Sequence, residues 1–281
     1  MTINLPLVEF YITNVCNLTC RGCNRFNNHN FKGHQRWDDH ASMYEAWSHR
    51  LDIEHITILG GEPTLNPDLE SWASNLRRLW PESEIMIQTN GTYIKPHFSK
   101  FWNDYRVGFA ISLHDINTAE QIIHDWKALF GDCFDVFLKG FVFHQSSIIE
   151  QDQGKLTLHN SDIIKAFNFC GMKYDHTMFN GKLYKCPMTA IIPEFNQQFN
   201  LNLDDRQKQL LDEYQPLTAD CTDQQLDDFV QQINTPIKQC EFCPMTPVWD
   251  LALGDSKPNV IQPEFDNITL KEIPFYKKLL T

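Results

Sequence analysis

The chain has 281 residues, 42% of them hydrophobic, so it is long enough to bury one large core or two moderate ones. Its formal net charge of -12 at pH 7 disfavours nucleic acid or an anionic membrane surface as a partner. No apolar run approaches the length of a membrane span, and the first residues lack a signal-peptide pattern, so we expect a cytoplasmic protein without membrane contact.

The first 169 residues alternate short apolar strand patterns with helical patterns. Because this alternation is typical of parallel strands joined by right-handed helical crossovers, it predicts an α/β fold with helices covering a parallel sheet. The predicted strands are 7–13, 55–59, 84–89, 107–113, 134–143 and 155–159. The predicted helices are 43–51, 66–80 with Asn66 as its N-cap, 96–103, 117–130, and one that begins after Asn160 or Ser161 and ends near Phe169.

Nine cysteines are many for a chain of this length, and their spacing does not suggest a secreted disulfide framework. In a reducing compartment such cysteines are more often metal ligands. Seven of them form two sets. Cys133 and Cys221 belong to neither set, and we interpret them as buried or incidental thiols.

The first set is Cys16, Cys20 and Cys23, a C-x3-C-x2-C pattern directly after the first predicted strand. Three thiolates on one loop can hold three irons of a cubane cluster and leave the fourth iron open for chemistry. The alternatives are a zinc knuckle or a chance group of thiols, although zinc usually takes four ligands. Gly60-Gly61-Glu62-Pro63 follows the second predicted strand, and two motifs in this order are much stronger than either alone.

Together these motifs resemble the signature of the radical S-adenosylmethionine (radical SAM) superfamily. The resemblance implies a partial (β/α)6 barrel over residues 1–169, with the active groups at the carboxyl ends of the strands. It implies that Cys16, Cys20 and Cys23 bind a [4Fe-4S] cluster. It further implies that Gly60, Gly61 and Glu62 hold the SAM amino group and that Ser112 contacts the SAM ribose or carboxylate.

The same resemblance implies a radical mechanism. An electron donor such as flavodoxin or ferredoxin reduces the cluster, SAM is cleaved to a 5′-deoxyadenosyl radical, and that radical removes a hydrogen atom from a substrate carbon. Four residues in or near the predicted strand ends are candidates for substrate contact: Gln88, His114, Lys139 and His144. Lys139 is alternatively an outward-facing lysine. One departure from the family is Gly22, where an aromatic residue often packs on the adenine, and Phe26 is a candidate for that role.

The second set is Cys170, Cys186, Cys240 and Cys243. Asn180-Gly181 predicts a two-residue hairpin turn that brings Cys170 and Cys186 together. The spacing C-x10-G-x4-C followed by C-x2-C resembles the twitch domain, a shortened SPASM extension that carries one auxiliary [4Fe-4S] cluster. Four cysteines also permit a structural zinc site. We therefore expect a twitch domain with a β-hairpin and helices at 170–250, and a tail at 251–281 that packs on the barrel.

An auxiliary cluster ligated by four cysteines is suited to electron transfer, which favours net oxidation of the substrate. We therefore expect a radical SAM oxidoreductase that dehydrogenates a small molecule or forms a new bond in it. The chain starts close to the first strand, which argues mildly against the alternative, a maturase of a ribosomally made peptide. The alternative that is not an enzyme is a non-catalytic, metal-stabilised binding module.

Overall fold

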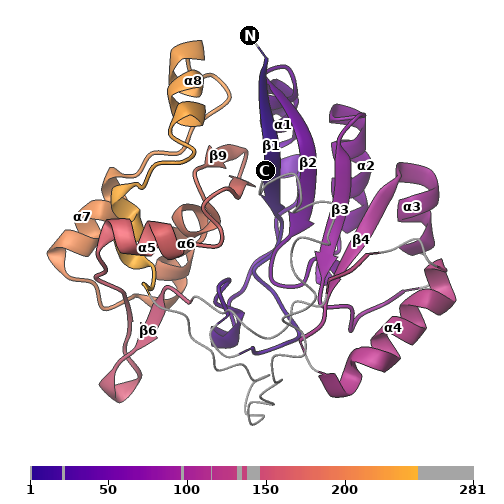
Figure 1. Cartoon of the computed structure of the whole chain (residues 1–281), viewed down its shortest axis with the longest axis horizontal. Helices are drawn as coiled ribbons and strands as arrows, with labels where there is room; N and C mark the ends of the chain where they lie inside the picture. Colours follow the sequence, from indigo (N-terminus) through magenta and orange to yellow (C-terminus); the bar gives the residue numbers. More distant parts are fainter. Residues whose placement is uncertain are drawn as a thin grey trace.

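The computed structural model describes residues 2–20, 23–95, 98–114, 116–131, 135–137 and 146–245 (Figure 1). Several expectations concern residues outside these ranges, namely Gly22, Cys133, Lys139, His144 and the tail 251–281. In the part of the chain that is described, no helix is both long enough and apolar enough to cross a lipid bilayer.

The described strands form one large sheet in the order β5-β4-β3-β2-β1-β8-β9. All neighbouring pairs in it are parallel except the last, in which β9 runs antiparallel to β8. The expected α/β fold with a mostly parallel sheet is thus confirmed. Its strands are β1 (Ile3–Tyr11), β2 (Leu51–Leu59), β3 (Glu84–Thr89), β4 (Val107–Ser112), β5 (Asp135–Phe137), β8 (His176–Phe179) and β9 (Lys182–Tyr184).

Helices follow the strands in the first half of the chain and dominate the second half. In Figure 1, α5 to α8 gather beyond β8 and β9, at the left, while α2 to α4 lie along the other strands. The α-helices are α1 (Ala41–Ser48), α2 (Leu69–Leu79), α3 (Ser99–Tyr105), α4 (Ile116–Phe130), α5 (Ile163–Phe169), α6 (Pro187–Phe199), α7 (Asp205–Glu213) and α8 (Asp223–Gln231), and two 3-10 helices matter below, η3 (Pro63–Leu65) and η6 (Lys238–Phe242).

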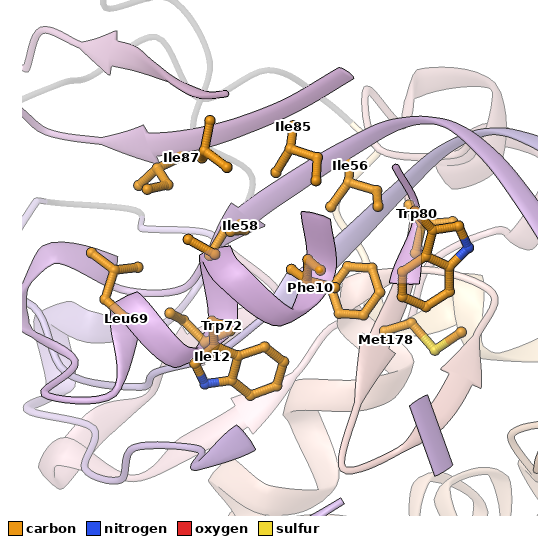
Figure 2. Close-up of a cluster of buried hydrophobic side chains, with 14 of the residues drawn as sticks. Phe10, Ile12, Ile56, Ile58, Leu69, Trp72, Trp80, Ile85, Ile87 and Met178 are labelled. Atoms are coloured by element: carbon orange, nitrogen blue, oxygen red, sulfur yellow. The ribbon is translucent and has the colours of Figure 1, made fainter. Parts of the chain in front are cut away.

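One face of the sheet packs against α1 to α4 through a large apolar core (Figure 2). Phe10 of β1 lies at its centre, fully buried, with its ring 5.6 Å from Trp80 and 6.4 Å from Trp72. Since successive residues of a strand point to opposite faces, Phe10 fixes the orientation of its neighbours. Glu9 and Tyr11 therefore point to the other face, which is the inside of the barrel.

The inner face of the sheet carries several polar side chains, whereas the face that bears Phe10 is mostly apolar apart from residues such as the buried His176 of β8. Glu9 of β1 lies in register with Thr57 of β2 and with Thr177 of β8. Gln88 of β3 donates a hydrogen bond to the Ser112 hydroxyl of β4 at 3.2 Å. Buried polar groups need partners, so this polar inner face is where the fold can hold a polar ligand.

The predicted sixth barrel strand at 155–159 is wrong. Its residues form β7 (Leu156–Leu158), which pairs antiparallel with β6 (Ile148–Glu150) in a separate two-stranded sheet. Residues that follow α6 hold β7 there, since the Asn202 amide donates to the Leu156 carbonyl at 2.7 Å. The strand that pairs in parallel on the far side of β1 is instead β8.

Two predicted N-caps are also wrong. Asp162, rather than Asn160 or Ser161, caps α5 by accepting from the Lys165 amide at 2.9 Å. The N-cap position of α2 is Asp68 rather than Asn66. The Asn66 side chain accepts from the Asp68 amide at 2.8 Å and donates to the Ile12 carbonyl at 2.7 Å, which ties the chain after η3 to the end of β1. Tertiary contacts decide both positions.

The predicted hairpin is confirmed. Asn180 and Gly181 have φ angles of 50° and 71° and join β8 to β9, as a two-residue turn requires. The indole of Trp47 donates to the Gly181 carbonyl at 3.0 Å, and the Gly181 amide donates to the Tyr44 hydroxyl at 3.2 Å. The hairpin turn is therefore clamped onto α1.

Replacement of Phe10 by alanine should lower the free energy of unfolding by about 3–5 kcal/mol, because it leaves a cavity among packed aromatic rings. Urea denaturation of the reduced apoprotein measures this change. As the control, Ile164→Ala removes a side chain that is 56% exposed and should change it by less than about 0.5 kcal/mol. Similar losses in the two variants would contradict this description of the core.

Candidate functional site

The cysteine loop follows β1 at the carboxyl edge of the sheet. The amide of Cys23 donates to the Cys20 carbonyl at 3.2 Å, and the Leu18 amide donates to the Cys16 sulfur at 3.4 Å. All three cysteines are half-buried and unoxidised. The structure thus brings together the three cysteines of the first predicted set.

Burial governs the acidity of these thiols. It raises the pKa of Cys16 and of Cys20 to about 12 and also raises the pKa of Cys23. The neighbouring thiols add to the increase for Cys16 and Cys20, so the three sulfurs share one electrostatic environment. Such thiols stay protonated at neutral pH until a cation stabilises the thiolates, and this donor set fits an iron–sulfur cluster.

The Gly60-Gly61-Glu62-Pro63 turn packs directly on the chain that leads into the cysteine loop. The amide of Gly61 donates to the Thr13 carbonyl at 2.7 Å, and the Glu62 amide donates to the Val15 carbonyl at 2.8 Å. A Cβ at Gly60 would lie 2.4 Å from the Thr13 carbonyl oxygen, and one at Gly61 would lie 2.4 Å from that of Val15. Only glycine permits this approach of two backbones.

The carboxylate of Glu62 is fully buried and accepts several hydrogen bonds. It accepts from the Thr64 amide at 3.1 Å, the Thr64 hydroxyl at 2.5 Å, the Thr89 hydroxyl at 2.7 Å and the Asn90 amide at 2.7 Å. Burial raises the pKa of Glu62, and these hydrogen bonds oppose that effect. Glu62 therefore ties η3 to the end of β3, while its expected contact with the SAM amino group remains a prediction.

Asn90, at the end of β3, completes the connection to the cysteine loop. Its side-chain amide donates to the Asn17 side chain at 2.9 Å and lies 3.8 Å from the Cys16 sulfur. From the sequence, Thr89-Asn90 was expected at the carboxyl ends of the strands, where active groups gather in a parallel fold. The sequence did not indicate which partners the Asn90 side chain has.

A buried ion pair lies on the inner face below the cysteine loop. Nη2 of Arg25 is 3.0 Å and 2.8 Å from the two carboxylate oxygens of Glu9. The Arg25 guanidinium carbon also lies 5.9 Å from the centre of the Tyr11 ring. Sequence reasoning missed this pair, although an acidic residue within the apolar strand Val8–Ile12 was a visible sign of it.

The remaining candidates for SAM and substrate contact divide into those that face the site and those that do not. Gln88 and Ser112 lie together on the inner face, as described above, and His114 lies two residues after the end of β4 and is half-buried. Phe26 is fully buried, with its ring 5.0 Å from that of Phe195, so its ring is unavailable to an adenine. The expectation for Phe26 is therefore wrong, because helix α6 covers it.

The second predicted set also comes together. Cys170, Cys186, Cys240 and Cys243 all line one pocket of about 660 Å³, a volume that includes space open to solvent. Burial raises the pKa of each of these thiols, to about 12 for Cys170, and neighbouring thiols of the same set add to the increase for Cys170, Cys240 and Cys243. The chemistry of four thiols on one pocket fits either a cluster or zinc.

Separate elements deliver these four cysteines. Cys170 follows α5, Cys186 lies between β9 and α6, and the other two lie in or directly after η6. Among the described side chains, no three of His, Cys, Asp and Glu are placed closely enough to hold a single metal ion. The evidence for the two thiol sets is that the members of the second set line one pocket and that thiols within each set raise one another's pKa.

Cys221 stands apart from both sets. Its sulfur accepts a hydrogen bond from Nη1 of Arg50 at 3.3 Å, and Arg50 also pairs with Asp223 at 2.8 Å. This contact fits the interpretation of Cys221 as a thiol with no ligand role.

Replacement of Gly60 by alanine should lower the free energy of unfolding by about 1–3 kcal/mol, because the new methyl group meets backbone atoms that must move. Urea denaturation of the reduced apoprotein measures the change. Gly171→Ala is the matched control, since its Cβ would meet no atom within 4 Å. If Gly60→Ala is as stable as the control, the two backbones do not approach as closely as described.

Replacement of Glu62 by glutamine should lower the free energy of unfolding by about 1–3 kcal/mol. The NH2 group of glutamine is a hydrogen-bond donor, and it would face the Thr89 hydroxyl or the Asn90 amide, which donate to the carboxylate in the parent protein. The same denaturation assay measures it. Glu82→Gln, at a solvent-exposed acidic residue on the turn after α2, is the control and should have little effect. An unchanged stability for Glu62→Gln would contradict a structural role for this carboxylate.

Comparison with known proteins agrees with this geometry. Residues 10–141 match the family model of the radical SAM superfamily. A GTP 3′,8-cyclase from Aquifex aeolicus (strain VF5) is 24% identical over 168 residues, which cover 58% of this chain and 49% of that protein. A GTP 3′,8-cyclase from Nautilia profundicola is 29% identical over 98 residues, covering 34% and 31%. The chain thus spans about half or less of these curated relatives.

The fold has a counterpart among solved structures. The structure of BtrN in complex with AdoMet and 2-DOIA superimposes with a TM-score of 0.52 and 14% identity, covering 90% of this chain and 100% of BtrN. At this identity the likeness concerns the fold alone. Residues 10–141, which include the cysteine loop at the end of β1, are thus similar to the radical SAM superfamily.

Proposed function

We propose that this protein is a radical SAM oxidoreductase that acts on a small molecule and uses an auxiliary iron–sulfur cluster. Cys16, Cys20 and Cys23 would hold the first [4Fe-4S] cluster. Cys170, Cys186, Cys240 and Cys243 would hold the second. The observation that carries the proposal is that the fold gathers these seven cysteines into two separate groups of three and four thiols.

When bound, the two clusters and SAM would supply one-electron chemistry. SAM would be the source of a 5′-deoxyadenosyl radical that takes a hydrogen atom from the substrate, and the auxiliary cluster would accept one electron as a proton leaves to solvent, for return to a carrier such as flavodoxin or ferredoxin. The substrate thereby loses two electrons and two hydrogens. The electron from the substrate radical needs an acceptor, and a cluster on the second thiol set would provide one in the same chain.

The residues of the chain have distinct parts in this scheme. Gly60 and Gly61 bring the turn after β2 against the start of the cysteine loop, and Glu62 and Asn90 fix β3 to the same loop. The SAM amino group would lie at this turn. Gln88 and Ser112, paired on the inner face, are positioned to bind the SAM ribose or the substrate.

Among the described residues, the charges around Arg25 on the inner face favour a neutral or cationic polar substrate over an anion. The buried guanidinium of Arg25 is already neutralised by Glu9, and Asp175 also acts on it. An additional anion there would meet a net negative environment. The relatives and BtrN differ in the small molecules that their names give, so the shared fold does not identify the substrate of this chain.

Anaerobic reconstitution with iron and sulfide tests the proposal. The parent chain should bind about eight irons, because each cubane holds four. The variant in which Cys16, Cys20 and Cys23 are replaced by alanine should keep about half of them. After reduction with dithionite and addition of SAM, 5′-deoxyadenosine should form with the parent and not with this variant.

The matched variant carries Cys170→Ala and Cys186→Ala. It should also keep about half of the iron, yet it should still produce 5′-deoxyadenosine, because SAM cleavage needs only the first cluster. Cys221→Ala is the control and should leave both readouts unchanged. Zinc in place of iron, with no 5′-deoxyadenosine even under strong reduction, would instead indicate a metal-stabilised binding protein.

A further inference from the structure

The lysine beside the second thiol set is unusually placed. Lys185 precedes Cys186 directly, lines the same pocket as the four cysteines and is 5% exposed. Its ammonium donates to the carbonyl oxygens of Gln232 and Ile233, in the turn after α8. Among the described residues, no carboxylate forms an ion pair with it.

A buried ammonium needs a compensating negative charge. Removing it from water costs several kcal/mol, and neutral carbonyl groups recover only part of this cost. The Lys185 charge acts on the thiols of Cys186 and Cys240 and on the buried His176, and of these groups only the thiols can become negative as metal ligands. As thiols these sulfurs carry no charge, whereas as ligands of a metal cluster they are thiolates.

Four contacts fix this lysine in place. Its backbone amide donates to the Tyr214 hydroxyl at 2.9 Å, and its carbonyl lies 3.1 Å from Nδ1 of the buried His176. With the two contacts of the ammonium, both ends of the residue are held. The position of the charge is therefore set by the fold rather than by a mobile side chain.

Other charges near the four cysteines do not cancel it. Glu241, between Cys240 and Cys243, is buried but is paired with Arg206 at 2.5 Å. Asp175 acts on Cys170, at another corner of the set. Lys173 lines the same pocket and adds a second positive charge. Lys185 is thus a buried cation that directly precedes Cys186 and whose charge acts on the sulfurs of Cys186 and Cys240.

We infer that Lys185 is a positioning residue that raises the reduction potential of the auxiliary cluster and so adapts that cluster to accept an electron. Reduction makes the cluster more negative, and a fixed positive charge in a low-dielectric site stabilises the reduced form more than the oxidised form. The inference rests on the proposed function, because it requires a cluster on Cys170, Cys186, Cys240 and Cys243.

The experiment uses the full chain with Cys16, Cys20 and Cys23 replaced by alanine, so that only the auxiliary cluster remains. In this background, Lys185→Gln keeps hydrogen-bond donors for the two carbonyl groups but removes the charge, whereas Lys185→Arg keeps the charge. Lys173→Gln is the control at the same pocket. Iron is counted, and the midpoint potential is measured by a redox titration followed by electron paramagnetic resonance.

The inference predicts that Lys185→Gln shifts the midpoint potential to a more negative value than Lys173→Gln does, while Lys185→Arg stays close to the parent. Loss of iron in Lys185→Gln with retention in Lys185→Arg supports it as well, since the charge then holds the anionic cluster. Equal potentials in Lys185→Gln and the parent overturn the inference and leave the proposed cluster intact. Loss of iron in both Lys185 variants indicates that the lysine has a structural role, and this result also overturns the inference. Absence of iron in the background chain refutes the proposed cluster itself.

Discussion

The close approach of two backbones at the carboxyl edge of the sheet is the constraint on which the site depends. Gly60 and Gly61 lie against Thr13 and Val15, where any Cβ would clash, and two amide-to-carbonyl hydrogen bonds close the gap. This contact joins the end of β2 to the first residue of the cysteine loop. The buried carboxylate of Glu62 then extends the connection to β3, so that three strand ends act as one rigid support.

The sheet separates two environments, and this separation makes the site possible. Its outer face buries Phe10 and other apolar side chains under α1 to α4, which supplies the stability. Its inner face buries Glu9, Thr57 and Ser112, which are costly unless they are paired. The fold thus places these polar groups on the inner face, next to the strand ends that carry the cysteines.

The second half of the chain is continuous with the barrel rather than an independent attachment. Strand β8 pairs with β1, and the β8–β9 turn is held by Trp47 and Tyr44 of α1. Since β9 leads directly into Lys185 and Cys186, the position of the second thiol set depends on the first strand of the sheet. This arrangement gives a physical route for coupling the two proposed redox sites within one structure.

The sequence alone determined the parallel α/β fold, the two cysteine sets, the glycine turn and the Asn180-Gly181 hairpin, because each depends on local spacing or on residues with special backbone freedom. It could not decide that β7 leaves the barrel, that β8 takes the place beside β1, or that Phe26 is covered by α6. Nor could it find the Glu9–Arg25 pair or the burial of Lys185. Strand partners and buried charges are settled by contacts between residues far apart in the chain, and only the tertiary structure supplies those.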